Sequence, residues 1–93
     1  MNKAEARRLL DERIHQLRQQ PYRALLQWLD APETTEVIGP SGQRYQVETQ
    51  SFWDDGQKSN LRVAVSIDDY GWRAFFPLTT DFIKSPDDQF TGK

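Results

Sequence analysis

The spacing of the apolar residues changes once along this chain, at Pro32, and that change constrains the fold more than any other feature. Before Pro32 apolar residues recur at helical spacing, beginning with Ala6, Leu10, Ile14 and Leu17. After it they alternate with polar residues, and turn residues separate the alternating runs. The sequence therefore predicts an α+β fold in which two helical segments pack on one face of an antiparallel β-meander.

Pro21 divides the helical part, which we place at about residues 3–30. Asn2 is a typical N-cap for the first helix. At roughly 100° per residue, the apolar residues after Pro21 point more than a quarter turn away from those before it, so one straight helix could not bury both sets. We predict a break near Gln20–Pro21, with Pro21 in the first turn of a second helix that ends before Asp30.

The sheet is expected at about residues 35–78, with three or four strands. The expected strands lie around residues 36–38, 44–53, 61–67 and 72–78. The alternation pairs Trp53 with Leu61 across a polar loop. A four-residue turn after Ile67 would place Trp72 opposite Ile67 and Leu78 opposite Leu61. Residues 79–93 are expected to cover a sheet edge and end in a loose tail.

Composition limits the classes of protein to which the chain can belong. Its 93 residues fit a single domain, residues 1–93. The absence of cysteine excludes disulfides, thiol catalysis and cysteine-based zinc sites. Neither a secretory signal nor an apolar run of roughly 20 residues is present, so we expect a cytoplasmic protein. The formal net charge is −2, which argues against nucleic-acid binding.

Few residues suggest chemistry. His15 is the only histidine, and the helical spacing places it opposite the apolar stripe, where we expect an ordinary surface residue. The aspartate pairs occur in predicted turns, where aspartate bonds its own backbone. The segment Gly39–Gly42 lacks the lysine and the following helix of a phosphate loop, so we interpret it as a hairpin turn. The sequence therefore predicts no catalytic, cofactor-binding or metal-binding residue.

The first helix carries several arginines that could be taken for a nucleic-acid-binding stripe. Arg7 and Arg8 each have an acid four residues later, which dilutes their field. Arg13 is expected to lay its stem over apolar surface while its head reaches solvent or an acid. Nucleic-acid binding through this helix therefore remains a weak alternative.

The face of the sheet opposite the core offers a candidate contact surface. Phe52 and Phe75 are predicted to point there, with Arg62 between them and Glu48, Arg73 and Asp68 around them. Two interpretations stay open. Either the segment from Phe82 to Phe90 folds back over both rings, or Phe52, Arg62 and Phe75 contact a protein partner.

The segment Gly71–Leu78, read GWRAFFPL, is followed by Phe82–Ile83 and Pro86–Asp87. This pattern resembles a motif of small uncharacterised bacterial proteins that are grouped as a domain of unknown function. The resemblance covers about the last third of the chain and implies a bacterial cytosolic protein. It implies no activity, cofactor or site residue.

Taken together, these features favour a non-enzymatic protein-interaction protein, such as a small adaptor or an immunity-type inhibitor. It would act through the open sheet face or through an acidic loop end. The alternatives are a metal-dependent or hydrolytic enzyme that uses the loop aspartates and, as above, weak nucleic-acid binding. An enzyme predicts a pocket where two acids or His15 converge.

Overall fold

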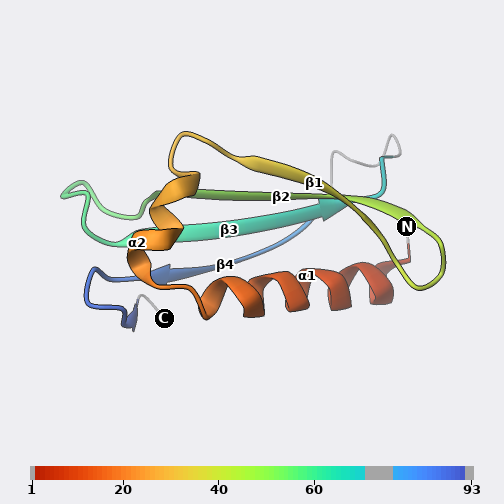
Figure 1. The fold of residues 1–93 in the computed structure, drawn as a ribbon, viewed down its shortest axis with the longest axis horizontal. Coiled ribbons are helices and arrows are strands. Elements are labelled where there is room, and N and C mark those ends of the chain that lie inside the picture. Colours follow the sequence, from red (N-terminus) through yellow and green to blue (C-terminus); the bar gives the residue numbers. More distant parts are fainter. Residues whose placement is uncertain (1, 71–76, 92–93) are drawn as a thin grey trace.

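The computed structural model describes residues 2–70 and 77–91. In this part of the chain a helical layer packs against one face of a five-stranded antiparallel sheet, in which the strands follow sequence order from β1 to β5 (Figure 1). The α+β prediction with two helical segments first is confirmed. The predicted strand number is wrong, because the sheet has five strands rather than three or four.

The helical layer begins with α1, Lys3–Arg18, and continues with the short helix α2, Tyr22–Leu25, and the 3-10 turn η1, Leu26–Trp28. The Asn2 side chain accepts a hydrogen bond from the Glu5 amide at 3.0 Å, which caps α1 as expected. Pro21, at φ −69°, is the N-cap of α2. The predicted break at Pro21 is therefore confirmed, with the proline one position before the helix.

One stripe of α1 faces the sheet, where Ala6, Leu10 and Leu17 are buried against β3 and β4. The C-terminal end of α1 is held by a side chain from the far end of the sequence. Lys84 is buried, and its ammonium group donates to the carbonyl oxygens of Arg18 at 3.3 Å and Gln20 at 2.7 Å. These carbonyls have no intrahelical partner, so the lysine satisfies them. Its positive charge also interacts favourably with the negative end of the helix dipole.

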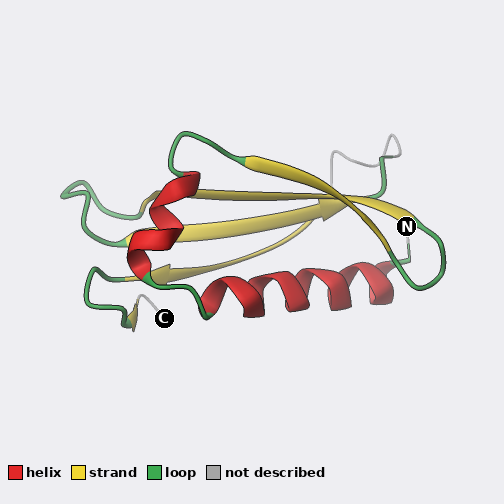
Figure 2. Ribbon diagram, viewed as in Figure 1, coloured by secondary structure: helices red, strands yellow, loops and turns green. Residues whose placement is uncertain are grey.

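Figure 2 shows the strands in yellow. Their bounds are β1 Glu33–Ile38, β2 Arg44–Trp53, β3 Leu61–Asp68, β4 Leu78–Lys84 and β5 Phe90–Thr91. Between β2 and β3 the predicted register is confirmed, because Trp53 pairs with Leu61 and Val47 with Ile67. Odd-numbered residues of β3 face the helices and are almost fully buried, whereas the even-numbered residues are only half-buried. The core face was thus assigned correctly.

The predicted register between β3 and its next neighbour is wrong. Ile67 pairs with Leu78 and Leu61 with Lys84, so β4 lies six residues further along the chain than expected. The segment at residues 79–84, predicted as an edge cover, is therefore most of β4. The expected strand at 72–78 falls largely on residues 71–76, which lie outside the described part. The shift is even, so Leu78 stays on the core face as predicted, and the apolar alternation fits both registers.

Within residues 2–70 and 77–91, no helix has the length and apolar character needed to cross a membrane.

Candidate functional site

Phe52 and Arg62 lie side by side on the sheet face that the helices do not cover. They are direct cross-strand partners in β2 and β3. The next pair on this face is Gln50 with Ala64, so a small side chain lies beside the ring. Phe52 remains 42% exposed, one of few large apolar side chains so open in the described chain. The structure therefore brings two of the three predicted contact residues together.

Phe75 is the third residue predicted for this surface. It lies outside the described residues, as does Arg73, which was expected at the rim. The site described below therefore consists of Phe52, Arg62 and their neighbours in β2, β3 and β4, and we call it the open-face site.

Arg62 is held between two carboxylates. Its Nε and Nη2 donate to Oδ1 of Asp54 at 3.0 and 2.8 Å, and its Nη1 donates to Oδ2 of Asp81 at 2.5 Å. The hydrogen bonds that Arg62 donates to Asp81 and then to Asp54 raise the pKa of Arg62 above its ordinary value. The guanidinium of this β3 residue is therefore fixed between β4 and the loop that follows β2. With two acids around one cation, the local charge is negative.

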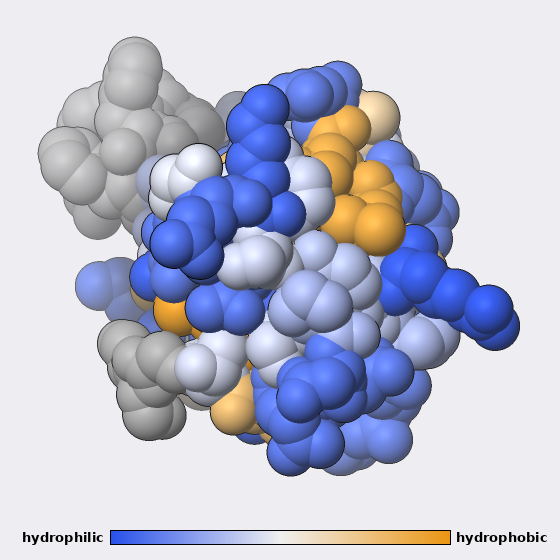
Figure 3. Space-filling view, turned by 90° about the vertical axis from the view of Figure 1, so that its left-hand side faces the viewer, coloured by the Kyte–Doolittle hydropathy of each residue, from blue (hydrophilic) through white to orange (hydrophobic). Residues whose placement is uncertain are grey.

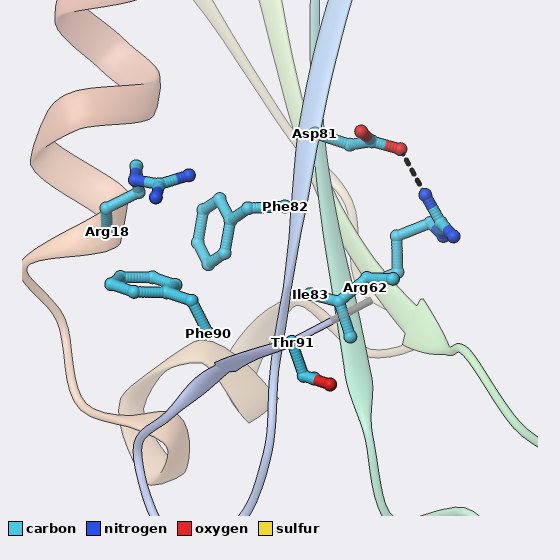
Figure 4. A pocket seen from close by; sticks show the side chains of 7 residues that line it. All are labelled: Arg18, Arg62, Asp81, Phe82, Ile83, Phe90 and Thr91. Atoms are coloured by element: carbon cyan, nitrogen blue, oxygen red, sulfur yellow. Dashed lines mark hydrogen bonds and ion pairs between the residues drawn. The ribbon is translucent and has the colours of Figure 1, made fainter. Parts of the chain in front are cut away.

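The segment from Phe82 to Phe90 does not cover Phe52. Figure 4 shows Phe82 and Phe90 on the helix side of β4, with Asp81 and Arg62 on the other side. The two rings meet edge to face with centroids 5.8 Å apart. The Arg18 guanidinium lies 4.2 Å from the Phe90 centroid and 5.5 Å from that of Phe82. The C-terminal segment is thus anchored to α1 by cation–π contacts. The interpretation in which this segment folds back over Phe52 is therefore wrong.

A small cavity of about 180 Å³ lies at this end of β4 (Figure 4). Its lining residues are Arg18, Arg62, Asp81, Phe82, Ile83, Phe90 and Thr91. The one carboxylate among them, that of Asp81, is bound by Arg62. A second, wider groove of about 380 Å³ runs between α1 and β1 and carries two acids, Glu12 and Glu33. There Arg13 lies 3.3 Å from Glu33.

Arg13 behaves as the sequence predicts. Its guanidinium lies 5.6 Å from the centroid of the buried Trp28 ring. Its Nε donates to the Thr49 hydroxyl at 3.2 Å, and its Nη2 reaches Glu33. The arginine thus joins α1, the 3-10 turn and the first two strands.

Asp55 and Asp68 hold turns, whereas Asp88 binds the start of α2. Asp55 accepts hydrogen bonds from the Ser59 amide at 3.0 Å and the Ser59 hydroxyl at 2.8 Å, which lower its pKa. Asp68 accepts from the Tyr70 amide at 3.0 Å, and Asp88 accepts from the Tyr22 amide at 2.6 Å. Across the described residues there is no cluster of three or more acidic or histidine side chains placed to hold a metal ion. His15 is exposed on α1.

The acidic loop end is formed by the β2–β3 loop and the turn after β4, which lie at the same end of the molecule as α2 (Figure 1). Figure 3 looks at this end, which is largely hydrophilic, with hydrophobic side chains gathered near its upper edge. Asp55 and Asp88 are already engaged by backbone amides and by Ser59, and Asp54 by Arg62, as described above. It is therefore a weaker candidate than the open-face site.

A polar cluster at the opposite end of the sheet was not predicted from the sequence. Glu5 is buried, and its carboxylate accepts hydrogen bonds from the Ser41 hydroxyl at 2.7 Å, the Ser41 amide at 2.8 Å and the Tyr45 hydroxyl at 2.8 Å. A Cβ added at Gly39 would lie 2.6 Å from this carboxylate, so the β1–β2 turn needs glycine there. The cluster fixes the start of α1 to the hairpin. Its two long-range partners, Ser41 and Tyr45, left no local signal in the sequence beyond Asn2 and Glu5 at capping-box spacing.

The Glu5 cluster should make stability depend on pH. The Ser41 hydroxyl and amide, and then Tyr45, lower the pKa of Glu5 below its ordinary 4.5. Burial and the Glu5 carboxylate together raise the pKa of Tyr45 to about 12. A lowered carboxyl pKa contributes stability above pH 4.5, and this stability is lost as the pH falls through the folded-state value.

We expect urea midpoints measured at several pH values to show this pH dependence of stability directly. The stability advantage of the wild type over Glu5→Gln should be constant near neutral pH and shrink as the pH falls below 4.5. Glu12→Gln, an exposed change on the same helix, is the matched control and should leave the profile unchanged. An advantage that grows toward low pH would contradict the assignment.

Comparisons with models of protein families, with curated proteins and with solved structures gave no match to this chain.

Proposed function

We propose that this chain is a non-enzymatic protein-binding domain, an adaptor or an immunity-type inhibitor, and that it binds its partner through the open-face site. The observation that carries the proposal is the exposure of Phe52 beside a fixed arginine on the face of the sheet that the helices do not cover. Aromatic and arginine side chains dominate the energetics of many interfaces. On the resemblance of its C-terminal third alone, we also propose a bacterial cytosolic protein.

Rigidity supports this assignment. Phe52 stands on the second strand of the sheet, and Arg62 beside it is fixed by Asp54 and Asp81. A side chain that is already ordered loses little conformational entropy when a partner binds. The site is therefore preorganised. Because its guanidinium donors are largely taken by the two aspartates, Arg62 would contribute its flat surface and its position rather than new ion pairs.

Charge indicates the kind of partner. Among the described residues the charged side chains of the open face are Glu36, Glu48, Asp54, Asp68 and Asp81 against Arg44 and Arg62. Acids outnumber bases, in agreement with the net charge of the chain. A basic protein surface would be attracted to this face, and the attraction would weaken as salt is added.

The proposal predicts that Phe52→Ser abolishes partner binding without unfolding the domain. An exposed aromatic at the centre of a contact contributes at least about tenfold in affinity, while its removal from a solvated face changes stability little. The measurement is quantitative recovery of partners on immobilised wild type and variants from an extract of the source cell. The double variant Phe52→Ser with Phe75→Ser extends the test to the third predicted residue.

His15→Ser is the matched control, because His15 is exposed on the helical layer, away from the open face. It should keep full recovery. Raised salt should reduce recovery by the wild type, since the proposed attraction is electrostatic. Unchanged recovery by a folded Phe52→Ser variant would contradict the proposal, and so would a loss of several kcal/mol of stability, which is the mark of a core residue.

A further inference from the structure

Strand β1 is an edge strand with a complete row of unpaired backbone groups. In the β1–β2 ladder the Gly39 amide donates to the Gln43 carbonyl at 2.8 Å, and Ile38 pairs with Arg44. Hydrogen-bonded and non-hydrogen-bonded pairs alternate along an antiparallel ladder. Residues 33, 35 and 37 therefore bond to β2. The amides and carbonyls of Thr34, Glu36 and Ile38 point away from the sheet.

These outward groups have no partner within the described chain. Five of the six side chains of β1 are exposed, and Ile38 reaches 64%. The opposite edge is covered in part, because β5 pairs with β4 at Ile83 and Lys84, and the turn that joins the two strands closes with a hydrogen bond from the Ser85 amide to the Gln89 carbonyl. Figure 1 shows β1 at the margin of the sheet.

The β1 edge lacks the usual protection against another strand. It pairs with β2 over six consecutive residues without a bulge, and it contains neither proline nor lysine. Its two acids are already neutralised by arginines of the same chain. Glu33 lies 3.3 Å from Arg13, and Glu36 lies 2.6 Å from Arg44. A second acidic strand could therefore approach without strong repulsion between carboxylates.

We propose that β1 pairs antiparallel with β1 of a second copy of this chain, about a two-fold axis at Thr35, to give a continuous ten-stranded sheet. Because the outward backbone groups belong to even-numbered residues, even-numbered residues of the two strands must lie opposite each other. In the register centred on Thr35, Thr34 lies opposite Glu36 of the second copy, and Thr35 lies opposite its own equivalent. Cross-strand threonine pairs are favourable.

Charge excludes one of the competing registers and fits a second copy as the occupant. Shifting the axis to Glu36 would oppose two identical carboxylates, which is unfavourable. In the Thr35 register no like charges are directly opposed, because Glu33 meets Val37 and Glu36 meets Thr34. The edge is thus complementary to itself, as an isologous two-fold contact requires. Both α1 helices would lie on one side, and both open-face sites on the other.

The dimer goes beyond the proposed function and does not depend on it. Sedimentation equilibrium of the full chain should show a reversible monomer–dimer equilibrium at concentrations up to about 1 mM, because the contact is a short strand pair rather than a large interface. A chain that stays monomeric over this range overturns the proposal.

Thr34→Pro tests the strand edge directly. The Thr34 amide points outward, so proline removes no hydrogen bond to β2 but removes a donor from the proposed contact. We expect dimerisation to weaken at least about tenfold while the circular dichroism of the fold is kept. Thr34→Val, which keeps the amide and the branched side chain, is the matched control and should dimerise normally. An unchanged dimer in folded Thr34→Pro would overturn the proposal.

Hydrogen exchange of the wild type gives a second readout, which needs no variant. The amides of Thr34 and Glu36 should become protected as the concentration rises, whereas exposed amides elsewhere should not. A dimer without protection at these two amides would place the contact elsewhere and contradict the assignment. Phe52→Ser should leave the dimer intact, so failure of the dimer and failure of the open-face site can be told apart.

Discussion

Replacing Leu10 with alanine is expected to lower the free energy of unfolding by about 2–5 kcal/mol. Leu10 lies on the buried stripe of α1 and has no accessible surface. The change removes apolar contacts and leaves a cavity between α1 and the sheet. Since α1 is the only long helix in the described chain, the loss falls on the main contact between the two layers.

The urea midpoint of the variant, measured against the wild type with the slope m fixed, gives this difference. Glu12→Ala is the matched control on the same helix, because Glu12 is exposed and alanine is a good helix former. We expect the control to change stability by no more than about 0.5 kcal/mol. Equal midpoints for Leu10→Ala and wild type would show that α1 does not pack as described.

The helical part of the fold could be predicted because its signals are local. The N-cap at Asn2 and the break at Pro21 each depend on a few neighbouring residues. The buried stripe follows from helical spacing, although Ile14 is only partly buried. This residue lies toward the margin of the helix face, and spacing alone does not show how wide a strip the sheet covers.

The sheet was predictable only where a short connection joined two clear strands. Between β2 and β3, the polar loop and the alternation of both strands agree on one register. For β4 the alternation fits two registers that differ by six residues. Pro77 was a usable signal, because proline is tolerated at the start of a strand and not in its middle. What distinguishes β4 is its contacts with α1 through Phe82 and Lys84, which no local pattern reveals.

For the candidate site, the strand alternation was enough to place Phe52 and Arg62 on the open face. The two carboxylates that fix Arg62 were harder to foresee. Asp54 lies just beyond the end of β2, but Asp81 reaches Arg62 only because β4 has the later register. The Glu5 cluster was missed for a similar reason, since its partners Ser41 and Tyr45 are far away in sequence.

The second large effect is expected in β3, the central strand. Val63→Ala and Val65→Ala should each lower the free energy of unfolding by about 1–3 kcal/mol. Both side chains are almost completely buried beneath the helices. Because strands flank β3 on both sides, the backbone cannot close easily over a cavity, so most of the lost contact should appear as lost stability.

Ser66→Ala is the matched control, because Ser66 lies on the same strand but on the open face. We expect it to change stability by no more than about 0.5 kcal/mol. Arg62, on the same face, is a poorer control, since its removal leaves Asp54 and Asp81 close together without a cation. If the valine variants matched Ser66→Ala in urea midpoint, the helices would have to pack on the other face. Phe52 would then lie in the core, and the open-face site could not exist.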